Sequence, residues 1–206
     1  MSRGLFITVE GTDGSGKTTQ IKLIEEYLKN KNKEVIITRE PGGTKISEKI
    51  RELILDTENT EMGIITEMLL YASARAQLVS ELIRPSVEAG KIVICDRFVD
   101  SSYVYQGFGR GIDLKIISDV NRIAVDGLVP ELTLFFDIHP SRALKRRIST
   151  TGADRIEKEK MDFHKRVYAG YKKLALLYPD RIRCIDSDRS IEEIFADVKY
   201  CIDELI

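Results

Sequence analysis

A glycine-rich segment between a short apolar run and an amphipathic stretch constrains the fold of this chain most. Residues 11–18 follow the pattern G-x-x-x-x-G-K-T, after the strand-like residues 4–9 and before residues 20–29, where apolar side chains recur at helical spacing. Glycine at positions 11, 14 and 16 lets the backbone curl where a Cβ would clash. Strand, loop and helix in this order predict a phosphate-binding loop (P-loop), whose backbone N–H groups surround an anion at the positive end of the helix.

Two side chains of this loop suit a nucleotide. We expect Lys17 to reach the outer phosphates and Thr18 to offer its hydroxyl to Mg²⁺. A glycine-rich turn that contains a lysine by chance is the alternative, and the motif by itself names no reaction. The sequence predicts that a nucleoside triphosphate is bound by Gly11, Thr12, Asp13, Gly14, Ser15, Gly16, Lys17, Thr18 and Thr19.

The rest of the chain indicates one α/β domain over residues 1–206. That length is enough for one sizeable core, and apolar residues are spread along it without a linker-like segment. Further strand-like runs lie at 35–38, 91–95, 132–138 and 181–185, and helical patterns at 44–55, 64–89, 113–125, 140–148, 157–178 and from 190 onward. This alternation predicts a three-layer P-loop fold, with a five-stranded parallel sheet flanked by helices.

Composition restricts partners and compartment. The chain has 32 Lys and Arg against 33 Asp and Glu, so no overall basic field suggests nucleic acid as a partner. Cys95, Cys184 and Cys201 lack metal-ligand spacing, and we expect free thiols in a reducing compartment. No secretion signal or membrane-spanning apolar run is evident, so we expect a cytoplasmic location and no membrane partner.

Polar side chains follow three of the expected strands. Arg39 follows the second strand, Asp96 and Arg97 follow the third, and the P-loop follows the first. Because the carboxyl ends of parallel strands meet at one edge of a sheet, these groups should converge.

Asp96 is a candidate to orient Mg²⁺ or its water shell, with a helix-capping aspartate as the alternative. Arg97 and Arg39 are candidates to clamp a second phosphate. For Arg51, inside a helical pattern, a solvated position and a ligand contact are equally consistent.

A triphosphate site opposite arginines suited to another anion favours phosphoryl transfer between two bound substrates. A switch GTPase is the first alternative. However, the sequence contains no N-K-x-D guanine-reading motif, and the strand that ends at Asp96 continues into Arg97 instead of a glycine-rich turn. These features favour a kinase.

Longer segments resemble bacterial thymidylate kinases, a family of P-loop nucleoside monophosphate kinases. They cover nearly the whole chain in the same order and spacing: FITVEGTDGSGKTTQ, TREPGGT, EKIRELIL, LLYASARAQLV, CDRFVDSSYVYQGFGRG, GLVPELTLFFDI and DRIE. The DRxxxSSxxYQG block with REPGGT is far more specific than the P-loop. The resemblance implies phosphorylation of dTMP to dTDP with ATP and Mg²⁺, in dTTP synthesis, by a cytoplasmic homodimer. The helical stretch 64–89 is our candidate for part of the dimer interface.

The resemblance also implies roles for single residues. Asp13 would accept the sugar 3′-hydroxyl, Tyr71 would stack on thymine, and Arg75, one helical turn later, would read O4 of the base. Tyr105 would crowd the 2′ carbon. From pattern alone, Tyr71 is more typical of a core residue. The expected acceptor-binding residues are Asp13, Arg39, Arg51, Tyr71, Arg75, Arg97, Ser102, Tyr105 and Gln106.

A lid at about residues 145–155 is expected to close over the phosphates. Many bacterial members carry several lid arginines because their P-loop lacks one, as this P-loop does. Here Ile148 and Thr150 stand where two arginines might be expected, and solvated lid charge is the alternative for each arginine that remains. The sequence does not decide which of these supplies the charge. The expected catalytic residues are Lys17, Arg97, Arg146, Arg147 and Arg155.

Two other functions stay open at this point. One is a kinase for a different acceptor, such as a deoxynucleoside or another monophosphate. The other is a non-catalytic nucleotide-binding regulator, which would have no need to keep Asp13, Arg97 and the Tyr71–Arg75 pair together. All four residues are present, which favours the enzyme.

Overall fold

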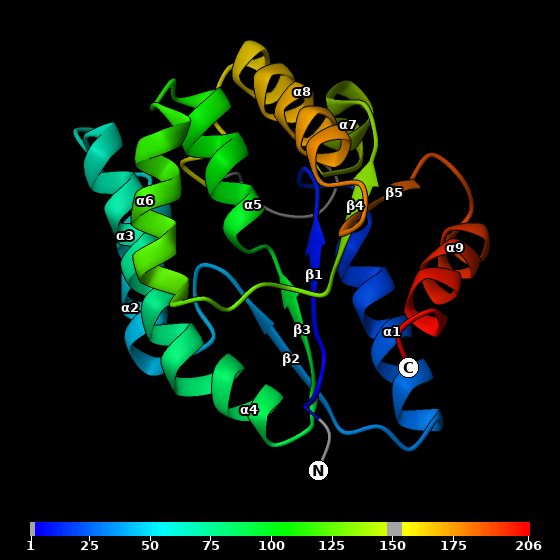
Figure 1. Cartoon of the computed structure of the whole chain (residues 1–206). Helices are drawn as coiled ribbons and strands as arrows, with labels where there is room; N and C mark the ends of the chain where they lie inside the picture. The colour runs from blue at the N-terminus through cyan, green and yellow to red at the C-terminus, as the bar shows by residue number, and fades with distance from the viewer. Residues whose placement is uncertain (1–2, 148–153) are drawn as a thin grey trace.

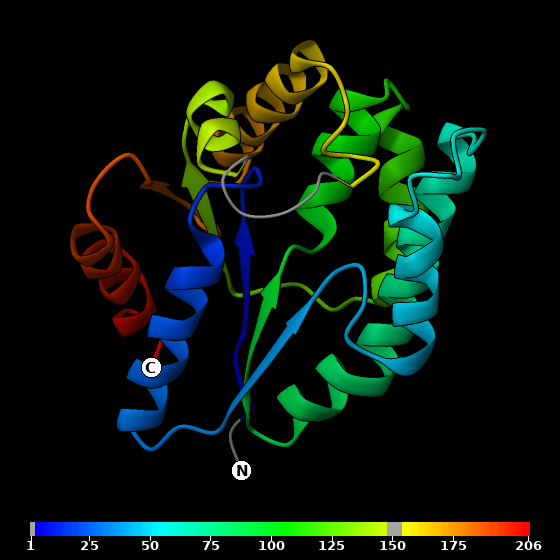
Figure 2. The same cartoon turned by 180° about the vertical axis from the view of Figure 1, so that it is seen from behind.

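The five strands form a single parallel sheet. The computed structural model describes residues 3–147 and 154–206, without the side chain of Arg147. The strand order is β2-β3-β1-β4-β5, and helices lie on both faces of the sheet (Figures 1 and 2). The expected three-layer α/β fold is therefore confirmed. The strands are β1 (Phe6–Glu10), β2 (Val35–Arg39), β3 (Ile92–Asp96), β4 (Leu132–Asp137) and β5 (Ile182–Asp186).

The helices follow the expected patterns with three differences. They are α1 (Lys17–Asn30), α2 (Lys45–Leu55), α3 (Ile64–Leu78), α4 (Arg84–Glu88), α5 (Val99–Ser102), α6 (Leu114–Val125), α7 (Pro140–Arg147), α8 (Met161–Leu177) and α9 (Ile191–Asp203), with π-helical segments η1 (Val79–Ile83) and η2 (Tyr103–Gly109).

The first difference concerns the stretch expected as one helix at 64–89, which consists of α3, η1 and α4 in succession. The backbone stays in the right-handed helical region across both junctions, so the apolar periodicity could not reveal the wider π-type turns. The second is that α5 and η2 were not expected, because glycines and aromatic residues hide the helical pattern of residues 99–109. The third is that α8 begins four residues later than expected, because Asp154 accepts hydrogen bonds from the backbone of Ile156 and Glu157 and holds a turn there.

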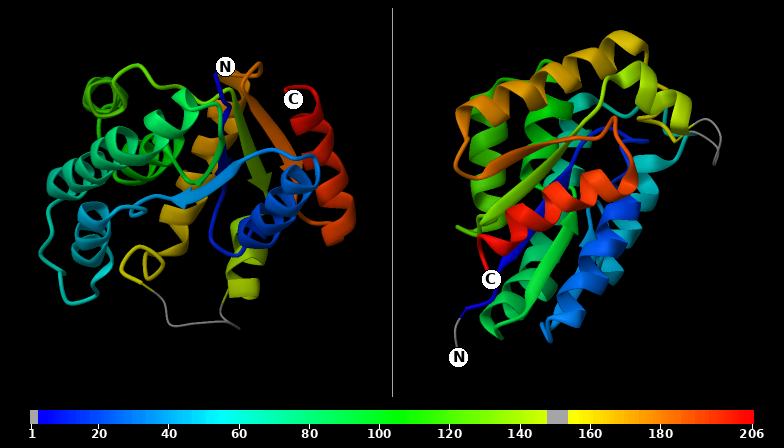
Figure 3. Two further views of the ribbon diagram at one scale, coloured as in Figure 1. Left: turned by 90° about the horizontal axis from the view of Figure 1, so that it is seen from below. Right: turned by 90° about the vertical axis from the view of Figure 1, so that its right-hand side faces the viewer.

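The central strand β1 is covered by helices on both of its faces. Every residue of β1 is buried, as expected of a parallel strand between two helical layers. On one face, β1 packs with Ile24 of α1 and Val198 of α9, helices that lie together in both views of Figure 3. On the other face, Phe6 makes an edge-to-face contact with Phe98 at 4.9 Å between ring centroids.

Two further expectations can be compared with the described residues. No helix in residues 3–147 or 154–206 has the length and apolar character needed to cross a membrane. Cys95, Cys184 and Cys201 are free thiols, as expected.

Candidate active site

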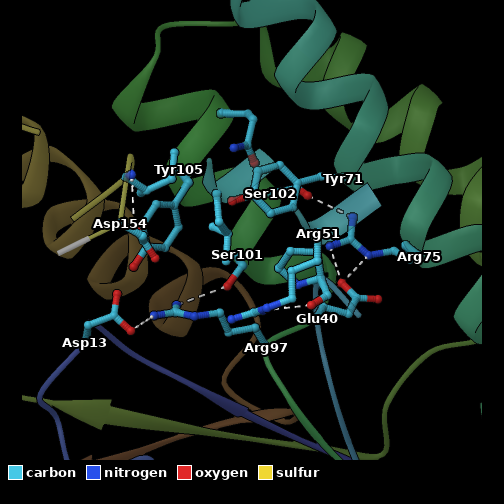
Figure 4. Close-up of a pocket in the computed structure, with 14 residues that line it drawn as sticks. Asp13, Glu40, Arg51, Tyr71, Arg75, Arg97, Ser101, Ser102, Tyr105 and Asp154 are labelled. Carbon is cyan, nitrogen blue, oxygen red and sulfur yellow. Dashed lines mark hydrogen bonds and ion pairs between the residues drawn. The ribbon is translucent and has the colours of Figure 1, made fainter. Parts of the chain in front are cut away.

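Two cavities meet at the carboxyl edge of the sheet. The inner cavity, of about 570 Å³, lies between the ends of β2 and β3, helices α2 and α3, and the segment α5–η2. The P-loop cleft, of about 1420 Å³, is lined by residues 13–20 and by Asp96, Arg146 and Arg189. Asp13 contributes to both linings. Eight of the nine expected acceptor-binding residues line the inner cavity (Figure 4): Asp13, Arg51, Tyr71, Arg75, Arg97, Ser102, Tyr105 and Gln106.

The P-loop has the geometry of an anion site. Helix α1 begins at Lys17, directly after Gly16, whose φ of 93° is left-handed. Gly14 also has a positive φ, of 82°, and a Cβ there would lie 2.1 Å from the Ala143 carbonyl oxygen. Both positions therefore favour glycine strongly. The expected turn before α1 is confirmed, and residues 13–20 line the cleft.

Lys17 is held inside this loop. Its Nζ donates to the carbonyl oxygens of Gly11 at 3.1 Å and Thr12 at 3.2 Å. Burial lowers the pKa of the Lys17 ammonium, and the positive charge of Arg97 acts in the same direction. A phosphate in the P-loop cleft would supply the negative charge that this buried ammonium needs.

Thr18 and Asp96 fit a role in binding Mg²⁺. Both line the P-loop cleft, Thr18 is exposed at the start of α1, and the buried Oδ1 of Asp96 makes no hydrogen bond to the described residues. Residues 3–147 and 154–206 contain no group of three His, Cys, Asp or Glu side chains that could hold a metal. A site with few protein ligands suits Mg²⁺, which keeps waters and substrate phosphates in its coordination shell.

Arg97 lines the inner cavity and pairs with Asp13, which lines both cavities. Its Nη2 donates to Asp13 Oδ1 at 2.9 Å, and its guanidinium lies 5.1 Å from the centroid of the Tyr105 ring. Behind it, Glu10 accepts hydrogen bonds from Ser101 Oγ and Tyr171 OH, each at 2.7 Å. Burial raises the pKa of Glu10, and the nearby carboxylate of Asp100 adds to this. Glu10 was not among the expected site residues, although it precedes the P-loop directly.

Arg75 is wholly buried and all its N–H groups are used. Nε and Nη2 both donate to Glu40 Oε2, at 2.8 and 2.5 Å. Nη1 donates to Ser102 Oγ at 2.8 Å and to Asn121 Oδ1 at 2.5 Å, and Nη2 also donates to the Phe98 carbonyl oxygen at 3.0 Å. Recognition of a base O4 by Arg75 would therefore require one of these hydrogen bonds to be shared or exchanged.

The other arginines at this edge differ in placement. Arg51 Nη1 donates to the Pro41 carbonyl oxygen at 2.8 Å and lines the inner cavity. Arg39 instead has a side chain that is 51% exposed and forms an ion pair with Glu48 at 2.9 Å. The structure does not bring Arg39 into the lining of the inner cavity. The reason is that alternate side chains of β2 point to opposite faces of the sheet, and Glu48 on α2 holds Arg39 at the surface.

The expected lid arginines also lie at different places in the structure. Arg146 lines the P-loop cleft and donates to the Ser187 carbonyl oxygen at 3.0 Å. Arg155 donates through Nε to the Ile54 carbonyl oxygen at 2.8 Å and through Nη2 to Glu67 at 2.7 Å, beside the inner cavity. The side chain of Arg147, together with Ile148 and Thr150, lies outside the described residues.

Sequence reasoning missed one wall of the P-loop cleft. Arg189, Ser190 and Ile191 line it, and Gln20 Nε2 donates to the Ile191 carbonyl oxygen at 2.9 Å. These residues begin α9, where a capping box joins Ser190 and Glu193. The S-x-x-E pattern predicts a helix start, but it contains no signal for contact with Gln20 of α1, 171 residues away.

Comparisons with known proteins identify the family of this chain. A family model described as thymidylate kinase matches residues 9–198. The chain is 50% identical over 196 residues to a thymidylate kinase of Thermoanaerobacter sp. (strain X514), covering 95% of this chain and 96% of that protein. It is 51% identical over 201 residues to a thymidylate kinase of Finegoldia magna, covering 98% and 97%. A crystal structure of thymidylate kinase from Ehrlichia chaffeensis superposes with a TM-score of 0.81 at 34% identity, over 98% of this chain and 99% of that one. The chain therefore belongs to the thymidylate kinase family.

Proposed function

We propose that the two cavities divide the substrates of the thymidylate kinase reaction, with dTMP in the inner cavity and ATP in the P-loop cleft. As a thymidylate kinase, the chain transfers a phosphoryl group from ATP to dTMP and yields dTDP and ADP. The observation that carries the division is that Asp13 belongs to both linings. ATP and dTMP bound in these two cavities would meet next to the Asp13–Arg97 pair. Phosphoryl transfer requires the two substrates to be this close.

In this proposal the inner cavity binds dTMP along its length. Arg97 and Arg51 bind the acceptor phosphate, and Asp13 accepts a hydrogen bond from the sugar 3′-hydroxyl. Tyr105 excludes a 2′-hydroxyl. Tyr71 stacks on the base, and Arg75, Ser102 and Gln106 line the end that faces its polar edge. Arg39 remains a candidate only if its ion pair with Glu48 opens when the phosphate binds.

The P-loop cleft binds ATP through the backbone N–H groups of residues 11–19, with Lys17 reaching the outer phosphates. Thr18 and Asp96 would hold Mg²⁺ or its waters, and the ion would neutralise charge on the phosphates. Lys17 stabilises the negative charge of the transferring group more than that of the ground state, which is how it lowers the barrier. Arg189, Ser190 and Ile191 form the wall suited to the nucleoside end of ATP.

Arg146 is our candidate for the arginine that approaches the transferring phosphoryl group. It lies on α7 and lines the P-loop cleft, whereas Arg155 is held by Glu67. Arg147 and the lid at 145–155 remain a prediction from the family resemblance.

The homodimer is also part of the proposal. Ile64, Ile65 and Leu69 of α3 are each nearly half exposed, and Ile46 and Leu53 of α2 are about equally so. Apolar patches of this kind are typical of protein interfaces. Sedimentation of the wild-type chain and of Leu69→Lys checks this: we expect a dimer for the first and a monomer for the second. The cytoplasmic location rests on the sequence alone.

A coupled assay of ADP release tests the function. We expect ADP only when dTMP and ATP are both present, and far less ADP with Lys17→Ala. Equal ADP release with and without dTMP would indicate an ATPase and would contradict the proposal. A screen of other monophosphates and deoxynucleosides as acceptors then compares their rates with that of dTMP.

A further inference from the structure

Glu67 is a buried carboxylate beside the inner cavity, and the proposed binding of dTMP gives this carboxylate no role. It lies on α3, one helical turn before Tyr71, and is 1% exposed. Oε1 accepts from Gln106 Nε2 at 3.0 Å and from Arg110 Nε at 3.2 Å. Oε2 accepts from Arg110 Nη2 at 3.0 Å and from Arg155 Nη2 at 2.7 Å. Three side chains from two segments, residues 106–110 and Arg155, therefore converge on one carboxylate.

The two arginines keep this carboxylate ionised and fixed. Arg110 also pairs with Glu159 at 2.5 Å and stacks over Phe163, and Arg155 is tied to the Ile54 carbonyl oxygen. Burial acts to raise the pKa of Glu67, but the hydrogen bonds from Arg110 and Gln106 outweigh it, so the pKa lies below its ordinary value. An ionised carboxylate has acceptor atoms only.

This chemistry determines which way the Gln106 amide faces. An amide carries two donors on its nitrogen and two acceptor lone pairs on its oxygen. Because Glu67 offers only acceptors, the Gln106 nitrogen must face it, and the carbonyl oxygen must face away from it. Gln106 is 2% exposed and lines the inner cavity, so its oxygen is available to a bound base at short range.

The neighbouring donor is Arg75, which would share or exchange one of its present hydrogen bonds when a base binds. Its Nη1 is hydrogen-bonded to Ser102, which lies one helical turn before Gln106, and both residues line the inner cavity. An acceptor beside a donor matches the edge of thymine, where N3–H donates next to the acceptor O4. Uracil has the same pattern. Cytosine reverses it, because its N3 accepts and its N4 amino group donates.

We propose that Glu67 is a positioning residue for base specificity: by fixing the Gln106 amide, it makes Gln106 Oε1 an acceptor for N3–H of the base and disfavours cytosine. This inference deepens the proposed binding of dTMP in the inner cavity and rests on it. Arg110 and Arg155 act indirectly, because they hold the Glu67 carboxylate in place.

The test compares kcat/KM for dTMP, dUMP and dCMP in the wild-type enzyme and in Glu67→Gln. An amide at position 67 can donate as well as accept, so the Gln106 amide becomes free to turn over and to accommodate cytosine. We expect the dTMP to dCMP ratio to fall about tenfold or more, and the dTMP to dUMP ratio to stay within about twofold. The matched control is Glu81→Gln, a solvent-exposed carboxylate in η1 that accepts from Gln77, and it should change neither ratio.

Two further variants separate this role from a merely structural one. In a Gln106→Leu background, Glu67→Gln should cause no additional change in the dTMP to dCMP ratio, because the amide through which it acts is gone. If Glu67→Gln alone does not fold, Glu67→Gln combined with Arg155→Met restores the charge balance. This double variant should lose discrimination. Arg155→Met alone should keep it, because Arg110 still donates two hydrogen bonds to the Glu67 carboxylate.

The outcomes are distinct. If Glu67→Gln or the double variant loses activity on all three nucleotides equally and keeps the wild-type ratios, the inference about Glu67 is overturned and the inner-cavity assignment stands. The same holds if Glu67→Gln still changes the dTMP to dCMP ratio in the Gln106→Leu background. A wild-type enzyme that accepts dCMP as well as dTMP would overturn both the base-reading part of the proposed function and the inference built on it.

Discussion

Arg97 Nη2 lies 2.9 Å from Asp13 Oδ1, so the residue after strand β3 forms an ion pair with a carboxylate inside the P-loop. Arg97 has a φ of 71°, a left-handed conformation that costs a non-glycine residue on the order of 1–3 kcal/mol. The backbone N–H of Arg97 donates to the Val9 carbonyl oxygen at 2.9 Å and stabilises this turn. Arg97 thus lines the inner cavity and is paired with Asp13, the carboxylate that lines both cavities.

Replacing Arg97 should therefore affect one substrate more than the other. We expect Arg97→Ala to raise KM for dTMP and to lower kcat, because the acceptor phosphate loses its clamp, while ATP affinity stays close to normal. Steady-state kinetics with each substrate varied, together with calorimetric titration of an ATP analogue, measure this. Arg122→Ala, an exposed arginine on α6 outside both cavities, is the control. Loss of ATP binding with unchanged dTMP binding would contradict the assignment.

Replacing Lys17 should abolish most turnover without unfolding the protein. Lys17→Ala removes a buried charge that we assign to the transferring phosphoryl group, and removal of one such group costs about 10²–10³-fold in kcat. Burial already lowers the pKa of this ammonium, so its loss should leave thermal stability nearly unchanged or slightly higher. Lys22→Ala, exposed on the same helix, controls for helix effects. Near-normal turnover in a folded Lys17→Ala protein would remove Lys17 from the mechanism.

The lid arginines can be distinguished by how much the replacement of each one lowers kcat. Arg146 lines the P-loop cleft, and we expect Arg146→Ala to lower kcat on the order of 10³-fold, as loss of an arginine finger does. Arg142, one turn earlier on α7, pairs like Arg146 with Asp188, so Arg142→Ala is a matched control with little expected effect. Arg147→Ala and Arg155→Ala complete the series. If all three lid variants are mild, the charge comes from elsewhere or is shared.

Arg75 should control discrimination at O4 of the base. We expect the order dTMP, dUMP and then dCMP far behind, because cytosine presents an amino donor to a guanidinium that has only donors. Arg75→Ala should narrow the dTMP to dCMP gap and leave the dTMP to dUMP gap nearly unchanged, since one missing methyl is worth roughly 10- to 200-fold through packing alone.

The Arg75→Ala variant leaves Glu40 buried without its ion-pair partner, which destabilises folded proteins by about 3–5 kcal/mol. Arg75→Met combined with Glu40→Gln avoids the unpaired charge and serves as the second variant. The measurement is kcat/KM for the three nucleotides. An unaltered dCMP gap in both variants would remove Arg75 from base reading.

Glu40 should make folding stability depend on pH. Burial raises its pKa to about 7 in the folded protein, despite the opposing charge of Arg75, from the ordinary value of 4.5. The folded state therefore keeps a proton that the unfolded chain releases between these values. This contribution to stability is fully present below the unfolded pKa and is lost as pH rises through 7.

Glu40→Gln removes this proton linkage. The free energy of unfolding of both proteins can be measured with urea between about pH 5 and pH 8. We expect the value for wild type minus the value for Glu40→Gln to fall by up to about 3 kcal/mol as pH rises, and then to level off. A relative stability that rises over this range would mean that the ion pair with Arg75 outweighs burial.

Much of the site could be predicted because its signals are local. The P-loop is one contiguous turn whose glycines and lysine carry the information by themselves. The apolar runs mark the strands, and in a parallel sheet the side chains that follow them must meet at one edge. Asp96 and Arg97 could be predicted in this way, whereas the role expected of Asp13 came from the family resemblance.

Tertiary structure alone decided which of these side chains meet. Glu67 and Arg155 are 88 residues apart, and Arg75 and Asn121 are 46 residues apart. No spacing rule predicts that such charges and amides will share one buried network. These contacts depend on how α3, α6 and η2 pack and on where the chain returns after residue 153. The sequence determined the fold and the chemistry at the strand ends, because backbone geometry there follows local residue choice. Long-range packing decides in which direction each arginine points, and therefore what it can bind. The reason is that a charge can be buried only where the packing supplies a partner for it.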